Sequence, residues 1–140
     1  IVDPPPSLGL LTINGLSAAE WVLIPIQAEF YSLEGMSQLL GLVRNVQGTI
    51  NPALKLFGIA LTLVQSNSRL GETVAEQARR HFGDRVFETE VPRLVAIAEA
   101  PLEGAPIVIA KKPNKSNPGS SAYWELAREA NERINRITGS

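Results

Sequence analysis

The sequence predicts an α/β fold built around a mostly parallel sheet. Two observations lead to this fold class. Short runs such as residues 21–26 are apolar at almost every position, which suits strands that helices cover on both faces. These runs alternate with longer segments whose apolar residues recur every three or four positions, the spacing of amphipathic helices. Strands and helices that alternate in this way form right-handed crossovers between parallel strands.

The composition agrees with a globular protein. The chain has 140 residues, of which 44% are hydrophobic and 19% charged, enough for one domain or part of one with a real core. Its net charge of −1 means that contact with nucleic acid would need a local basic patch. The absence of cysteine excludes disulfides, thiolate nucleophiles and cysteine-bound metal clusters. No apolar run has the length of a membrane span, so we expect a cytoplasmic protein.

The first half of the chain contains four predicted elements. Residues 1–3 resemble the end of a buried strand, and the prolines that follow cannot continue it. Ser7 is a good N-cap for a helix over residues 8–19. Residues 21–26 form a buried strand, and apolar residues at helical spacing predict a helix over 30–48.

The second half continues the alternation. The expected elements are a strand at 56–64, a helix at 70–82 ended by Gly83, a strand opening at 86–87, a short helix at 94–100, a strand at 106–110, a turn-rich loop at 111–120 and a last helix at 119–137.

The last helix has a predicted packing face. Its apolar residues share one side, while Glu129 and Arg133 lie elsewhere with the other charged residues. Acids balance bases on the polar side, which favours a docking helix over a membrane-surface helix. The predicted packing face consists of Tyr123, Leu126, Ala127, Ala130, Ile134 and Ile137.

Asp3 is the first candidate site residue. It follows an apolar strand and precedes a proline-rich loop and a helix, which places it at the carboxyl edge of a parallel sheet, where ligands bind. A carboxylate there can hold the water shell of Mg²⁺. The same acid could instead cap the loop, and spacing alone leaves both interpretations open.

Residues 3–40, from DPPPSLGLL to GMSQLL, resemble the ParA/Soj stretch of the deviant Walker P-loop ATPases. The resemblance continues through NPALKLFGIALTLVQ at 51–65, the block at 74–107 and GSSAYWELARE at 119–129. It implies that the fold is the C-terminal portion of a doubly wound P-loop NTPase sheet with flanking helices. Residues 1–140 would then be a single partial domain.

The resemblance also implies functional roles. Asp3 takes the Walker B-like position associated with the metal, and Pro92 and Arg93 lie where the family contacts adenine. The full-length protein would use ATP and Mg²⁺, dimerise on nucleotide and act with a ParB-like partner. The glycine-rich loop whose lysines and N–H groups hold the phosphates is not in these 140 residues. We therefore expect no catalytic residue in this chain and no ATP hydrolysis by it alone.

Non-specific DNA is a further expected partner. Two family arginines that bind DNA align with Asn67 and Ala96, and neutral residues cannot replace phosphate contacts. Other basic residues nearby could bind DNA weakly, with a nucleoid-associated location if they do, although a solvated loop is the alternative for the lysines. These residues are Arg69, Lys111, Lys112 and Lys115.

The sequence bears on three alternative functions. A non-catalytic binding or assembly module, from a truncated or degenerate paralogue, is indicated by the missing loop and arginines. A MinD-like positioning ATPase is disfavoured by the last helix. A nitrogenase-iron-protein-like reductase needs cysteines for its cluster, and the chain has none. Without the N-terminal strands of the family fold an apolar sheet edge would be uncovered, and we expect self-association, as a homodimer, to cover it.

Overall fold

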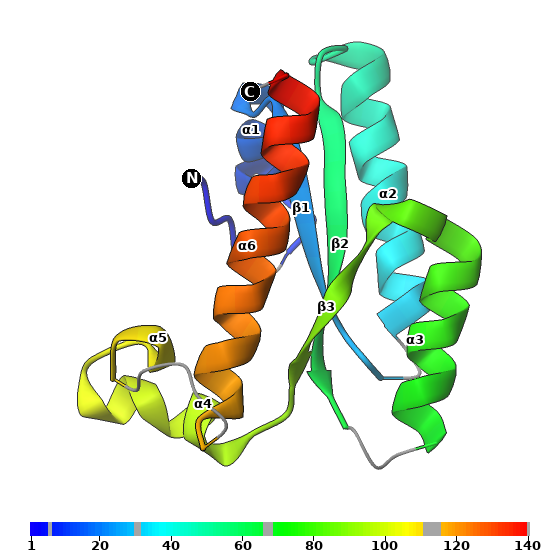
Figure 1. Ribbon diagram of the computed structural model, residues 1–140. Coiled ribbons are helices and arrows are strands. Elements are labelled where there is room, and N and C mark those ends of the chain that lie inside the picture. The colour runs from blue at the N-terminus through cyan, green and yellow to red at the C-terminus, as the bar shows by residue number, and fades with distance from the viewer. Residues whose placement is uncertain (6, 30–31, 66–68, 111–115, 140) are drawn as a thin grey trace.

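The computed structural model is a three-stranded parallel sheet with helices on both faces (Figure 1). It describes residues 1–5, 7–29, 32–65, 69–110 and 116–139. The strand order β1-β2-β3 follows the chain. The elements are α1 (Leu10–Ala18), β1 (Trp21–Gln27), α2 (Ser32–Thr49), β2 (Lys55–Val64), α3 (Arg69–Phe82), the 3-10 turn η1 (Gly83–Arg85), β3 (Val86–Pro92), α4 (Val95–Glu99), the 3-10 turn η2 (Ala100–Glu103), α5 (Ile107–Ala110) and α6 (Pro118–Thr138).

The parallel register brings the three strand ends to one edge of the sheet. Along β1 and β2 the partners run from Trp21 opposite Lys55 to Gln27 opposite Thr62. β3 ends with Pro92 opposite Val64 of β2. The predicted parallel α/β fold is therefore confirmed, and so is the helix end at Gly83, whose φ of 58° is a left-handed conformation that suits glycine.

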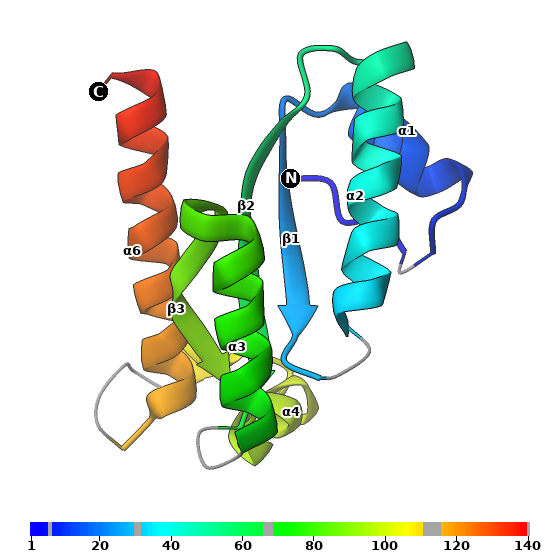
Figure 2. The same cartoon turned by 90° about the vertical axis from the view of Figure 1, so that its right-hand side faces the viewer.

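One face of the sheet packs against α2 and α3, which lie next to each other in Figure 2. Alternate residues of the strands supply this core because successive side chains point to opposite faces. They meet Met36 of α2 and Val74 and Ala78 of α3, all buried. The strand residues of this core include Ile24, Ile26, Ile59, Leu61 and Val86.

The opposite face carries α6, which runs along β3 in both views (Figures 1 and 2). Phe87 is fully buried on this face and meets Phe57 edge to face, with ring centroids 5.7 Å apart. Towards β1 the face is less covered. Trp21 is 36% exposed and Leu23 43% exposed. The sheet is thus covered on both faces at β3 and on one face at β1.

Glu129 of α6 binds the backbone of β3 directly. Its two carboxylate oxygens accept hydrogen bonds from the N–H groups of Glu88 and Thr89, each 2.9 Å long. These N–H groups lie where the register between β2 and β3 shifts, and a bulge of this kind leaves backbone groups unpaired. Burial alone would raise the pKa of Glu129, but hydrogen bonds from Thr89, Glu88 and Arg133 together lower it.

Arg133 completes the contact between α6 and β3. It forms an ion pair of 2.9 Å with Glu129 and donates hydrogen bonds to the carbonyl oxygens of Asp84 and Val86, at 3.0 and 2.9 Å. Its guanidinium carbon lies 4.0 Å from the centre of the Phe87 ring, a cation–π contact. The predicted packing face of the last helix was wrong in this respect, because Glu129 and Arg133 lie inward.

The rest of that predicted face is divided. Leu126 and Ala130 are partly buried, whereas Ala127 is exposed and Tyr123, Ile134 and Ile137 are 37%, 46% and 48% exposed. The apolar stripe therefore lies on one flank of the packed face. The pattern of apolar residues did not predict the contact between α6 and β3, because the unpaired backbone groups of β3 require polar partners.

Three other local predictions were wrong. Residues 107–110 form the helical turn α5, not a strand, and pack against α6 and η2. A short apolar run does not distinguish the two states, and Pro106 lacks the N–H that a strand would use. Ser7 does not cap α1, whose N-cap is Gly9. Residues 1–5 form no strand and are exposed.

No helix in the described ranges is both long enough and apolar enough to cross a membrane.

Candidate functional site

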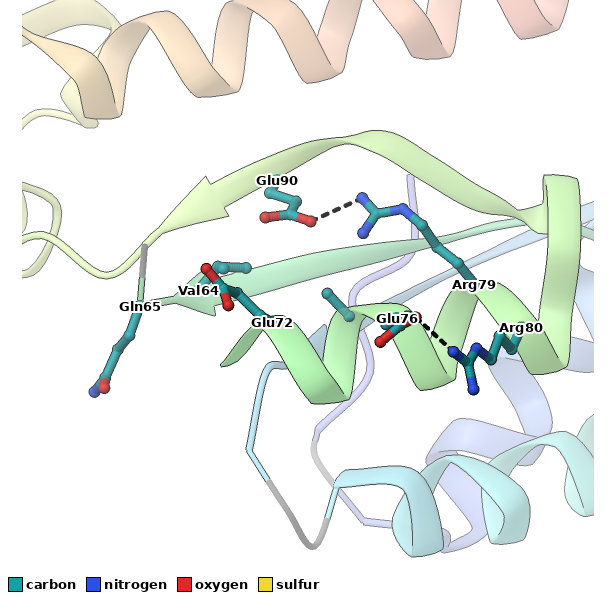
Figure 3. A pocket seen from close by; sticks show the side chains of 8 residues that line it. Val64, Gln65, Glu72, Glu76, Arg79, Arg80 and Glu90 are labelled. Atoms are coloured by element: carbon teal, nitrogen blue, oxygen red, sulfur yellow. Dashed lines mark hydrogen bonds and ion pairs between the residues drawn. The ribbon is translucent and has the colours of Figure 1, made fainter. Parts of the chain in front are cut away.

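The carboxyl edge of the sheet is the candidate site, since ligands of open parallel sheets bind where the strands end. There the ends of β2 and β3, together with α3, surround a cavity of about 680 Å³ (Figure 3). This volume is in the range of small-molecule sites. The described residues that line it are Val64, Gln65, Glu72, Ala75, Glu76, Arg79, Arg80 and Glu90.

The charges in this cavity are mostly paired. Arg79 reaches from α3 to Glu90 of β3, at 2.8 Å, and Arg80 pairs with Glu76 one turn earlier on α3, at 2.6 Å (Figure 3). The first pair joins the helix to the strand across the cavity. The second is largely exposed, so it adds little stability. The described lining residues therefore hold no excess of positive charge of the kind that a triphosphate would need.

Arg93 lies just beyond β3 at the same edge. Its backbone N–H donates to the carbonyl of Val64, at 2.9 Å, which extends the parallel ladder by one residue. Its guanidinium forms an ion pair of 2.9 Å with Glu29, after β1, with both side chains about half exposed. Arg93 thus spans the ends of three strands. Its planar, exposed guanidinium can stack on a base or bind an anion there.

Pro92 precedes Arg93 and pairs with Val64 in the register. Proline fixes the backbone direction at this point and donates no hydrogen bond. The structure thus places both predicted base-contacting residues at the carboxyl edge, next to the cavity.

The backbone of β2 is strained at this edge. Leu63 has a φ of 53°, and it is the one non-glycine residue in the described ranges with a positive φ. A left-handed conformation costs a residue with a side chain about 1–3 kcal/mol, and such residues gather at functional sites. The strain lies one residue before Val64, where the cavity begins.

Asp3 lies apart from this cavity. It is exposed in the extended segment before α1 and is not among the described lining residues. No group of three or more histidine, aspartate or glutamate side chains converges in the described ranges. One exposed carboxylate, with no loop that holds phosphates, does not form a Mg²⁺–ATP site from these residues alone.

The predicted DNA-contacting residues are only partly described. Arg69 is exposed at the first residue of α3, and Ala96 lies in α4. Lys111, Lys112 and Lys115, together with Asn67, lie outside the described residues.

No sequence pattern indicated Glu29, Arg79 or Glu90 as site residues. Their pairs join residues that are 64 and 11 positions apart. No short spacing signals such contacts, because they depend on which strands become neighbours. The pair Glu129–Arg133 did have a signal, since an acid four residues before a base is a favourable helical spacing.

Comparisons with known proteins agree with this fold. A family model described as an AAA domain matches residues 1–56. The chromosome partitioning protein ParA of Caulobacter vibrioides is 41% identical over 95% of the chain, and the chromosome-partitioning ATPase Soj of Thermus thermophilus is 43% identical over 96%. The sporulation initiation inhibitor protein Soj of Bacillus subtilis is 45% identical over 92%.

The chain belongs to the ParA/Soj family. It spans about half the length of these relatives, 49% of the Caulobacter protein, 50% of the Bacillus protein and 53% of the Thermus protein. A cobyrinic acid a,c-diamide synthase from Mycobacterium smegmatis, solved with an ATP analogue and magnesium, superposes with a TM-score of 0.71 at 30% identity. The match covers 99% of the chain described here and 47% of the synthase. The predicted fold class, a portion of a P-loop ATPase sheet, is confirmed.

Proposed function

We propose that this chain is the C-terminal part of an ATP-dependent partitioning ATPase, and that residues 1–140 form one partial domain of it. The observation that carries the proposal is the identity of 41–45% to three ParA and Soj proteins over 92–96% of the chain. Similarity of that extent covers every element of the sheet. In the whole protein, ATP and Mg²⁺ are the cofactors, and the chain alone is inactive.

Arg93 and Pro92 contact the adenine base in this proposal. Their place at the end of β3 supports it, because the edge is shared by all three strands and the Arg93 side chain is exposed. Asp3 acts on the water shell of Mg²⁺, which takes few protein ligands and keeps most of its water. A phosphate-binding loop elsewhere in the polypeptide supplies the charge that the transferred phosphoryl group requires.

The experiment is ATP binding and hydrolysis by the full-length gene product. Arg93→Ala is expected to weaken ATP binding about tenfold, since a stacking or charge-assisted contact contributes about 1–2 kcal/mol. Asp3→Asn is expected to lower the hydrolysis rate with little effect on nucleotide binding without metal. Arg128→Ala is the matched control, because Arg128 also forms an exposed ion pair, 3.1 Å long, but lies on α6. Equal effects of Arg93→Ala and Arg128→Ala would reject the assignment of Arg93.

The second candidate function is a non-catalytic binding or assembly module. It is favoured by the neutral residues Asn67 and Ala96 at positions where the family resemblance places DNA-binding arginines. If full-length protein neither binds nor hydrolyses ATP while it still forms complexes with partner proteins, this alternative replaces the first.

Partners of the whole protein are a second copy, a ParB-like protein and non-specific DNA. The exposed apolar side of β1, with Trp21 and Leu23, supports self-association of the chain. Light scattering tests it, and a monomer at high concentration would contradict it. DNA binding through Arg69, Lys111, Lys112 and Lys115 should weaken steeply with salt, because it rests on counterion release. A DNA affinity that stays constant as the salt concentration rises would contradict a role of these residues in DNA binding.

A further inference from the structure

A second cavity, of about 470 Å³, opens at the end of the sheet opposite to the candidate site. It lies where β2 begins, between the middle of α2 and the end of α3, two helices that are neighbours in Figure 2. The candidate site lies where β2 ends, at Val64, so the two cavities are separated by the length of this strand. The described residues that line it are Leu40, Val43, Arg44, Gln47, Leu54, Lys55, Leu56, His81, Phe82 and Arg85.

The lining divides into an apolar floor and a basic rim. On the floor, Val43 and Leu54 are buried, at 2% and 1% exposure, and Phe82 is partly buried. The rim carries the exposed side chains of Arg44, Lys55, His81 and Arg85. No aspartate or glutamate is among the described lining residues. We name this feature the basic pocket.

The basic side chains of the rim form no ion pair with a carboxylate in the described part of the chain. Elsewhere five arginines pair with carboxylates at 2.6–3.1 Å. Within the described ranges neither Arg44, Lys55 nor Arg85 forms such a pair. Lys55 instead lies 5.3 Å from the centre of the Trp21 ring, and Gln47 already donates its amide to the carbonyl of Leu54, at 2.7 Å. The ammonium of Lys55 is thus directed to Trp21, and the guanidinium charges of Arg44 and Arg85 stay at the rim without a carboxylate partner in a chain of net charge −1.

The helix dipole does not account for this cluster. Basic residues in the last turn of α3 offset the negative end of that helix, and His81 is one of them. Arg44 lies within α2, five residues before its end, and Lys55 is the first residue of β2. Uncompensated like charges near one another cost free energy, which an anionic ligand would recover.

We propose that the basic pocket binds an organic phosphate, whose apolar body contacts the floor and whose phosphate contacts Arg44 and Arg85 on the rim. Arginine suits this role because its planar guanidinium can donate two hydrogen bonds to one phosphate. A volume of about 470 Å³ admits a ligand of this class. The site is independent of the proposed ATPase function, because its residues lie at the other end of the sheet.

The test uses phenyl phosphate as the probe, with inorganic phosphate and phenol as comparisons. Binding is followed by NMR through the side-chain amide of Gln47, which lies in the pocket. Phenyl phosphate should bind about tenfold or more tightly than either comparison, since it uses both the floor and the rim. The double variant Arg44→Gln with Arg85→Gln should lose about tenfold or more in affinity for phenyl phosphate and none for phenol.

Arg128→Gln with Arg136→Gln is the matched control, because it removes two exposed charges from α6, outside the pocket. It should leave phenyl phosphate binding unchanged. Equal losses in the two double variants would overturn the proposal, because they would show a general effect of net charge. Absence of any shift of the Gln47 amide up to millimolar phenyl phosphate would overturn it too. A short DNA duplex that displaces phenyl phosphate would identify nucleic acid as the source of the phosphate, and a duplex that does not would identify a free small molecule.

Discussion

Glu129 and Arg133, one turn apart on α6, form an ion pair of 2.9 Å and together bind the backbone of β3 and of the η1 turn before it. The carboxylate accepts from two N–H groups of the strand, and the guanidinium donates to two carbonyls. The helix therefore pairs backbone groups that a neighbouring strand would otherwise take. Both side chains are mostly buried, at 13% and 16% exposure, so their hydrogen bonds are shielded from competing water.

Glu129→Gln is expected to destabilise the fold by about 1–3 kcal/mol, because the amide oxygen replaces only one carboxylate oxygen and the amide NH2 group then faces the other strand N–H, which loses its acceptor. The measurement is the midpoint of urea unfolding. Glu132→Gln is the control, since Glu132 is 51% exposed and pairs with Arg128 on the surface. Its effect should stay below about 1 kcal/mol. Similar losses in the two variants would contradict a special role for the contact with β3.

The contact should also depend on pH. Hydrogen bonds from Thr89, Glu88 and Arg133 outweigh burial and lower the pKa of Glu129 in the folded state below its ordinary value of 4.5. A carboxyl whose pKa is lower when folded contributes stability that is full above its unfolded value and is lost as pH falls through the folded value.

The stability difference between the wild type and Glu129→Gln should therefore be constant near neutral pH and shrink below pH 4.5. Urea unfolding at a series of pH values measures it. If this stability difference grew as the pH fell, the pKa of Glu129 could not be lowered in the folded state, and the explanation would be rejected.

The sequence predicted β1 and β2 well because both strands are apolar at almost every position. Residues 21–26 and 56–64 read as apolar runs, and the structure has strands at Trp21–Gln27 and Lys55–Val64. Residues 107–110 form a run of the same kind but became a helical turn, since the neighbours that decide between strand and helix are distant in sequence.

The candidate site was predictable only where its residues belong to one continuous block of sequence. Arg93 was assigned to the adenine contact through a resemblance that covers a continuous block, and the structure has it at the carboxyl edge of the sheet. Its partner Glu29 is 64 residues away, and nothing local indicates that the ends of β1 and β3 meet. The buried Glu129 was assigned to the wrong face because a rule that places charged residues outside does not anticipate unpaired strand backbone.

Gly58 of β2 should not tolerate a side chain. A Cβ at this position would overlap the ring of Phe87 and lie 3.0 Å from the carbonyl oxygen of Arg85. Phe87 is fully buried, so its ring has no space into which to move. Gly58→Ala is expected to destabilise by about 1–3 kcal/mol through overpacking, measured as a shift in the thermal unfolding midpoint.

Gly48→Ala is the control for Gly58→Ala. Gly48 lies in α2, and an added Cβ would meet no atom within 4 Å. Alanine there should stabilise the fold by about 0.5–1 kcal/mol, because glycine is a poor helix former. Equal destabilisation in both variants would show that the loss of glycine flexibility matters, and not the contact with Phe87.

Asn51 ties the end of α1 to the turn that precedes β2. Its side-chain amide donates to the carbonyl oxygens of Leu16 and Ala19, at 3.0 and 2.7 Å. The last carbonyls of a helix have no partner within it, so these hydrogen bonds replace water at a partly buried helix end. Removing a donor from two such acceptors should cost about 1–3 kcal/mol.

Asn51→Ala is thus expected to lower the free energy of unfolding and to speed hydrogen exchange in α1 more than in α3, since α1 is joined to the rest of the fold through few elements. Asn45→Ala is the matched control, because Asn45 is exposed on α2 and its backbone carbonyl, the acceptor for Thr49, is kept. Exchange that rises equally in α1 and α3 would mean that the variant lowers global stability only, and that Asn51 does not act as a local clamp on α1.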